Sequence, residues 1–139
     1  PFYFKEGFAK VRQGGKYGYI NKSGELLIKC IYDFANCFSE GLAMVKKDGK
    51  YSYVDKNGEM IIKCIYDCPC SFKEGLACVE QGGKCGFIDK QGNLVIDFIY
   101  DYANSFSKGV ARVKLNNERF YIDRKGSRIK SLGCFSRRK

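Results

Sequence analysis

Short apolar stretches with alternating side chains run along the whole chain, separated by turns that contain glycine. In an extended chain, Ala43 and Val45 would point to one side of the backbone, and Leu42 and Met44 to the other. An alternation of period two predicts a β-strand and not a helix. Glycine falls at up to four places in each section of this kind. Each would cost about 1 kcal/mol inside a helix, so a helical repeat is excluded.

The pattern returns with a fixed period. The sequence Phe-Lys-Glu-Gly-Phe-Ala-Lys-Val begins at residue 4, and its equivalents begin at residues 38, 72 and 106, which is a spacing of 34. Such a period indicates a small unit that cannot bury its apolar face alone and is stabilised by stacking on its neighbours. We expect residues 1–139 to form one repeat domain that is a fragment of a longer protein. Its units would be 4–37, 38–71, 72–105 and 106–139.

Each unit contains three apolar stretches, two tight turns and one longer connection. Asn117 stands in the first turn where the other three units have glycine, so this position should adopt a left-handed backbone. The second turn begins with Asn or Asp and ends with Gly, which is typical of a type I turn. The sequence therefore predicts an all-β fold of about twelve short antiparallel strands, as a tandem array of three-stranded meanders. The array would be open and curved or twisted, and a closed, propeller-like arrangement is the alternative.

Residues that recur at one place in several units have structural explanations. The phenylalanines and tyrosines should form rows in the core, where equivalent rings meet; an exposed aromatic groove is the alternative. The glycines serve the turn. The glutamates before them should have the same structural role as the aspartates, and Lys108 in the fourth unit indicates that their charge is dispensable. The aspartates should accept backbone N–H bonds where the chain leaves the third strand. These positions are Phe4, Phe38, Phe72, Phe106, Gly7, Gly41, Gly75, Gly109, Tyr32, Tyr66, Tyr100, Asp33, Asp67 and Asp101.

The order Glu-Gly-Leu-Ala-x-Val, then Gly-Lys-aromatic-Gly-Tyr-Ile-Asp-Lys-x-Gly, then Ile-x-x-x-Tyr-Asp resembles the WG repeat of bacterial proteins. The resemblance covers essentially the whole chain. The chain departs from it in having no Trp, and the Trp-Gly pair is replaced by Tyr17-Gly18, Tyr51-Ser52, Cys85-Gly86 and Arg119-Phe120. The resemblance implies a β-rich interaction or structural module with no catalytic residue set of its own.

Basic residues outnumber acidic ones by 25 to 15, which gives a net charge of +10. Four of them hold the second position of the second turn in successive units and would line one edge of a stacked array. Such an edge could bind an acidic partner or follow a phosphate backbone; the alternative is a set of solvated turn residues. The row consists of Lys22, Lys56, Lys90 and Arg124.

Histidine is absent, which removes Ser-His and Cys-His nucleophilic pairs and most catalytic zinc sites. The eight cysteines mostly replace other apolar residues at repeat positions, so we expect small buried side chains and a reducing, cytoplasmic compartment. A zinc site of Cys64, Cys68, Cys70 and Cys78 is the less favoured alternative, because the paired Cys-x-x-Cys spacing is missing.

These features predict a non-catalytic module with no cofactor that offers an interaction or scaffolding surface to another protein or domain. Binding of nucleic acid or another polyanion through the basic edge is the alternative function. No apolar run approaches the roughly 20 residues of a membrane span. The stretch 132–135, which replaces Ile-Tyr-Asp in the fourth unit, is expected to cap the array.

Overall fold

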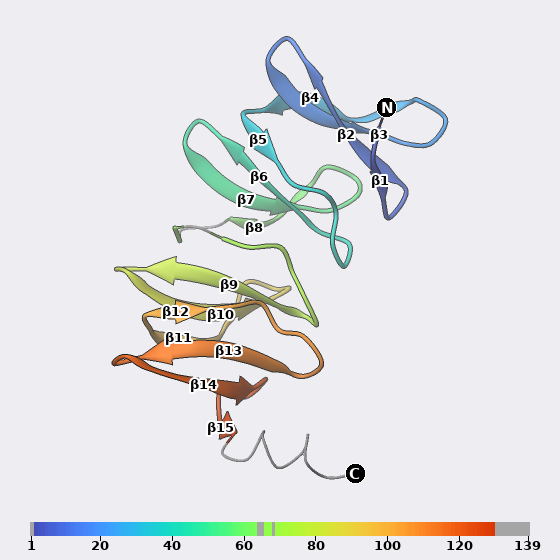
Figure 1. Ribbon diagram of the computed structural model, residues 1–139. Helices are drawn as coiled ribbons and strands as arrows, with labels where there is room; N and C mark the ends of the chain where they lie inside the picture. The colour runs from blue at the N-terminus through green and yellow to red at the C-terminus, as the bar shows by residue number, and fades with distance from the viewer. Residues whose placement is uncertain (1, 64–65, 68, 130–139) are drawn as a thin grey trace, which may run out of the picture.

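Four small antiparallel sheets stacked one after another form the computed structural model (Figure 1). The structure describes residues 2–63, 66–67 and 69–129. The first and the fourth sheet lie at opposite ends of the stack, so the array is open, as predicted, and not closed. Within those ranges every regular element is a strand. None of them holds a helix that could cross a membrane. The expected cap at 132–135 lies outside the described residues.

Each sheet is a meander in which consecutive strands are neighbours. The first sheet consists of β1 (Phe4–Lys5), β2 (Phe8–Gln13), β3 (Lys16–Ile20) and β4 (Leu26–Tyr32). The second consists of β5 (Phe34–Ala35), β6 (Ala43–Lys47), β7 (Lys50–Val54) and β8 (Met60–Lys63). The third consists of β9 (Leu76–Gln81), β10 (Lys84–Asp89) and β11 (Leu94–Tyr100). The fourth consists of β12 (Tyr102–Ala103), β13 (Val110–Leu115), β14 (Glu118–Asp123) and β15 (Arg128–Ile129).

The two-residue strands β1, β5 and β12 were not among the three strands predicted for each unit. β5 follows β4 after a single residue, Asp33, and pairs with β6, so that Phe34 lies opposite Lys46. The chain therefore crosses from one sheet into the next at this point. A strand of two residues carries no alternation, and its pairing depends on where the neighbouring hairpin lies.

The first turn of each hairpin has two successive residues with positive φ. The values are 51° and 79° at Asp48 and Gly49, and 52° and 68° at Asn116 and Asn117. The left-handed backbone predicted at Asn117 is thus confirmed. Two positive φ angles are typical of type I′ turns, whose twist matches that of the flanking strands.

The apolar core lies between the sheets. Ala43 and Val45 pack with Tyr19 of the preceding sheet, whereas Leu42 and Met44 pack with Phe72 after the second sheet. Alternate side chains of β6 therefore contribute to two different clusters, and both faces of the strand are buried. A third cluster spans the junction of the third and fourth sheets in the same way. This arrangement confirms the prediction that stacking buries the apolar surface of each unit.

In the first and third units, the glycine at the third position of the second strand allows close contact with the third strand. A Cβ atom added at Gly18 would lie 2.3 Å from the carbonyl oxygen of Ile28, and one at Gly86 would lie 2.5 Å from that of Ile96. The pairing register shifts at both places. Gly18 and Gly86 are therefore needed because the backbones approach there.

Candidate interaction surface

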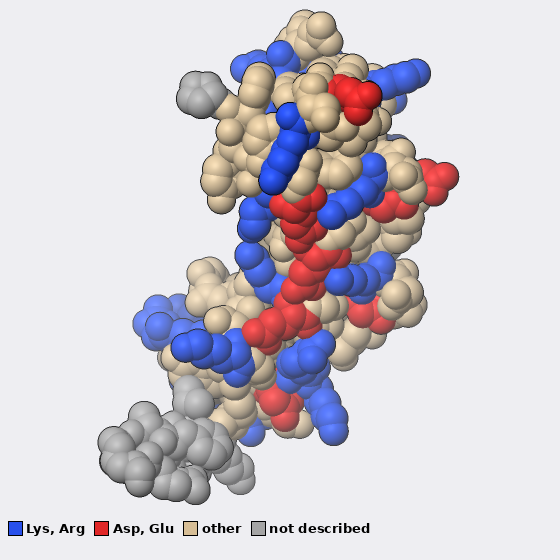
Figure 2. Space-filling model, turned by 90° about the vertical axis from the view of Figure 1, so that its right-hand side faces the viewer, with Lys and Arg blue, Asp and Glu red and all other residues tan. Residues whose placement is uncertain are grey.

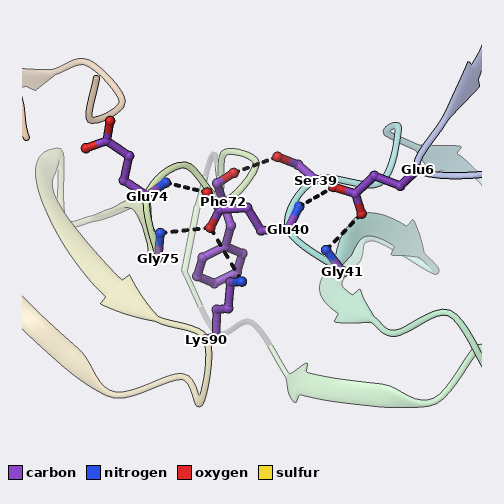
Figure 3. A network of polar contacts seen from close by, with 8 residues as sticks. All are labelled: Glu6, Ser39, Glu40, Gly41, Phe72, Glu74, Gly75 and Lys90. Atoms are coloured by element: carbon purple, nitrogen blue, oxygen red, sulfur yellow. Dashed lines mark hydrogen bonds and ion pairs between the residues drawn. The ribbon is translucent and has the colours of Figure 1, made fainter. Parts of the chain in front are cut away.

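A glutamate carboxylate bridges each pair of consecutive sheets. Figure 3 shows the first two of these junctions. The carboxylate of Glu40 accepts the N–H groups of Glu74 and Gly75 at 2.5 and 2.8 Å. The other two junctions repeat the arrangement: Glu40 and Gly41 donate to Glu6 at 2.7 and 2.9 Å, and Lys108 and Gly109 donate to Glu74 at 2.6 and 2.9 Å. We call this series of carboxylates the glutamate ladder (Glu6, Glu40 and Glu74).

The backbone of these turns is suited to bind an anion. Glu40 has a φ of 55° and Gly41 a φ of 83°, and the equivalent pairs in the other units differ by at most one degree. Successive left-handed residues direct their two N–H groups toward the same side, which makes a concave anion site. A left-handed glutamate costs roughly 1–2 kcal/mol. The charge-assisted bonds that its N–H group and carboxylate make to the adjacent units offset this cost.

The glutamates have a structural role, as predicted, although their partners are not in their own turn. Their carboxylates do accept backbone N–H groups, but these groups belong to the next unit, 34 and 35 residues further along the chain. Lys108 occupies the position of the ladder glutamates in the fourth unit, and it has no carboxylate that could accept N–H groups from a further unit. The ladder consequently has a direction, with acceptors pointing toward the C-terminal end of the array.

Electrostatics favours the ionised form of the first carboxylate. Burial acts to raise the pKa of Glu6, but the N–H groups of Gly41 and Glu40 and the ammonium of Lys56 lower it more, so the net shift is downward. The folded protein therefore holds this carboxylate in the charged state that the ladder requires.

The predicted basic row lies beside the ladder and partly neutralises it (Figure 2). Nζ of Lys56 is 3.8 Å from Oε1 of Glu6, and Nζ of Lys90 is 3.5 Å from Oε1 of Glu40. Each pair joins a turn to the glutamate of the preceding unit. The acidic stripe flanked by basic side chains in Figure 2 is thus a surface of mixed charge.

The two ends of the basic row differ from its middle. The guanidinium of Arg124 lies against the Glu74–Gly75 turn, where a Cβ atom on Gly75 would be 3.1 Å from Nη2. Lys22 is exposed on the first sheet, and within the described part of the chain it forms no ion pair with a ladder glutamate. The row is therefore not a uniform edge of free cations.

Aspartates hold the exits of the third strands. Oδ2 of Asp33 accepts the N–H group of Asp48 at 3.0 Å, and its other oxygen pairs with Lys16. The hydrogen bond from Lys16 and that from the N–H group of Asp48 together lower the pKa of Asp33. Asp101 makes the same contacts with Asn116 and Lys84, whereas Asp67 exchanges backbone hydrogen bonds with Glu80.

The repeated aromatic rings are arranged differently from the prediction. Phe38, Phe72 and Phe106 are buried, and Tyr32 and Tyr100 are buried as well, but Phe4 and Tyr66 are only partly covered. Each buried phenylalanine packs edge-on against an aromatic ring of the preceding unit, at centroid distances of 4.8 to 4.9 Å. The pairs are Phe38 with Tyr19, Phe72 with Tyr53, and Phe106 with Phe87. At each junction, therefore, the rings that meet come from different repeat positions, and not from equivalent positions as predicted.

Exposed apolar pairs begin the third strand in the first three units. Leu26 is 49% exposed, Met60 60% and Leu94 45%, and each is followed by a second exposed apolar residue. We call these six residues the apolar rows: Leu26, Leu27, Met60, Ile61, Leu94 and Val95. Arg128 and Ile129 take the equivalent positions in the fourth unit. The sequence could have indicated this exposure, because three apolar residues in succession cannot all point to the same, buried face of a strand.

A cleft of about 860 Å³ lies beside one of these pairs, at the junction of the first and second sheets. Its walls include Ile31 and Tyr32 from the first sheet, Tyr51 and Met60 from the second, and Tyr66 from the segment after the second sheet. Lysine side chains of the second sheet also line it. Repeated exposed apolar side chains next to a partly aromatic cleft are typical of a surface that binds a protein segment.

The described part of the chain contains two of the four cysteines considered above as a zinc site, Cys70 and Cys78. Cys64 and Cys68 lie outside the described residues. Among those that are described, no group of three His, Cys, Asp or Glu side chains could hold a metal ion. Cys78 is buried, and its thiol lies 3.8 Å from the carbonyl oxygen of Ala103. A hydrogen bond to Cys70 and burial raise the pKa of Cys78. This supports the interpretation of Cys78 as a small buried hydrophobe.

The comparisons with known proteins agree with this architecture. The sequence model of a family described as "WG containing repeat" matches residues 2–17, 17–51, 51–85 and 86–118. Curated proteins gave no match. The matched segments cover most of the chain, and the first three of them end at residues 17, 51 and 85, which reproduces the 34-residue period of the sequence. The chain therefore belongs to the WG containing repeat family.

Proposed function

We propose that this array is a non-catalytic module that binds a protein partner along the apolar rows and the adjoining cleft. The observation that carries the proposal is the repeated exposure of two large apolar residues at the start of β4, β8 and β11. Soluble proteins seldom expose contiguous apolar surface without a binding role. Membership of a repeat family is consistent with a scaffolding or interaction module, because a repeated surface can engage one partner at several units.

The apolar rows are large enough to contribute substantially to binding. Covering the exposed half of one Leu, Ile or Met side chain stabilises a complex by about 1 kcal/mol. The six residues together would supply on the order of 6 kcal/mol, whereas micromolar affinity corresponds to about 8 kcal/mol. Contacts in the cleft would therefore add to the apolar rows in a complex of moderate affinity.

The test replaces one residue of each apolar pair. A variant with Leu27→Ser, Ile61→Ser and Val95→Ser should keep its far-UV circular dichroism and lose at least tenfold in affinity for a partner isolated with the wild-type array, measured by titration calorimetry. The matched control changes exposed polar residues of two of the same strands that do not line the cleft, Lys29 and Asp97, to Ser. Equal affinity of both variants would exclude the apolar rows as the binding surface.

Polyanion binding through Lys22, Lys56, Lys90 and Arg124 remains the second candidate, supported by the net charge of +10. The pairing of Lys56 and Lys90 with glutamates makes it the weaker one. Binding of double-stranded DNA that falls steeply between 50 and 200 mM salt, and is lost in a Lys22→Glu, Lys56→Glu, Lys90→Glu variant, would favour it over the protein partner.

A further inference from the structure

The first unit contains a carboxylate site of the kind that the other units fill. The Glu6–Gly7 turn has φ values of 54° and 84°, nearly those of the turns at Glu40, Glu74 and Lys108. In the three later turns both N–H groups donate to a glutamate of the preceding unit. Among the residues that the structure describes, no carboxylate accepts the N–H groups of Glu6 and Gly7.

A lysine ammonium belongs to this site in addition to the two N–H groups. Lys56 and Lys90 each approach the ladder carboxylate that is bound by the turn of their own unit. Lys22 is their equivalent in the first unit and is exposed. The first unit therefore carries the same three donors, two N–H groups and one ammonium, that surround Glu6 and Glu40 at the later junctions.

The apolar surface around this site is also uncovered. In the second, third and fourth units, each of which packs on a preceding unit, the side chains at four repeat positions are buried. In the first unit, three of these positions, Phe4, Val11 and Ile20, are only partly buried. Their buried equivalents are Phe38, Phe72 and Phe106 for the first, Val45, Val79 and Val113 for the second, and Val54, Ile88 and Ile122 for the third.

We propose that this end of the array binds the glutamate of a Glu-Gly turn presented by another WG repeat unit. The occupant is a WG unit because its carboxylate matches the donors of Glu6, Gly7 and Lys22, and its apolar face matches Phe4, Val11 and Ile20. A wild-type copy of this chain is a poor occupant, since its last turn would bring the Lys108 ammonium to the same donors. The proposal is independent of the apolar rows on β4, β8 and β11.

The test adds a unit in register. Residues 38–68 are placed directly ahead of Pro1, so that the added copy of Glu40 precedes the Glu6–Gly7 turn by 34 residues. Amide exchange is followed by NMR, with the amides of Glu74 and Gly75, whose site is filled in the native chain, as the internal reference. We expect exchange at Glu6 and Gly7 to slow at least about tenfold. Glu→Ala in the added unit should remove that protection.

A second arm identifies the source of the carboxylate. Unlabelled chain carrying Lys108→Glu is mixed with labelled wild-type chain, and the same amides are observed. Protection on mixing means that a separate chain can supply the carboxylate, whereas protection in the fused protein alone assigns the site to a covalently joined unit. If Glu6 and Gly7 exchange at the wild-type rate in both arms, or if Glu→Ala in the added unit leaves their protection intact, the proposal is overturned.

Discussion

Replacing Glu40 by alanine removes the central link of the glutamate ladder. The substitution deletes the acceptor of the Glu74 and Gly75 N–H groups and leaves the apolar cluster at that junction in place. Both donors are then left to water at a partly buried position. We expect the second and third sheets to separate more easily, since the stability of a stacked array depends on its junctions.

The magnitude follows from the two hydrogen bonds. A bond to a charged group contributes about 1.5–3 kcal/mol. The side chain of Glu40 is 30% exposed, so values near the lower end apply, which gives about 3 kcal/mol for the pair. The 3.5 Å contact with Lys90 adds at most about 0.5 kcal/mol, because exposed ion pairs are weak. For a chain of this length, 3 kcal/mol corresponds to a fall of roughly 10 °C in Tm.

Lys108→Ala is the matched control. Lys108 has the same φ of 55° as Glu40, so alanine experiences the same backbone strain at both positions. Its side chain accepts no bond from a following unit, and we expect a change within about 0.5 kcal/mol. Urea unfolding followed by far-UV circular dichroism gives both free energies of unfolding. Amide exchange at Glu74 and Gly75 gives the local effect. Equal losses for the two variants would refute the structural role of the ladder.

Three further outcomes are expected. The pKa of Glu6 is lowered in the folded protein, so its ionised carboxylate stabilises the fold at pH values above the ordinary pKa of 4.5. This contribution is lost as the pH falls through the folded pKa. The Tm of Glu6→Gln should therefore fall less than that of the wild type between pH 6 and pH 3. Tyr19→Phe removes a buried hydroxyl that donates to the carbonyl of Asn36 at 2.5 Å, and should cost about 1 kcal/mol in urea unfolding, a result contradicted by an unchanged midpoint. Gly86→Ala places a Cβ atom 2.5 Å from the carbonyl oxygen of Ile96 and should cost at least about 2 kcal/mol, whereas retention of wild-type Tm would show that the third strand can move away.

Local features of the chain account for much of the fold. The alternation of apolar residues specified strands, and the 34-residue period specified stacked units with shared cores. Asn117 in place of glycine indicated a left-handed turn residue, which its φ of 68° confirms. These properties depend on a few neighbouring residues and on repetition, so they can be recognised without knowing how the units are placed.

Contacts between units could not be predicted in this way. Glu40 meets a turn 34 residues away, Phe38 packs on the unlike ring of Tyr19, and Leu26 remains exposed although Ile28 in the same strand is buried. Each of these outcomes depends on the rotation and offset between neighbouring sheets. The rotation and the offset are set by the simultaneous packing of both faces of every sheet. The repeat pattern in the sequence is compatible with several rotations and offsets.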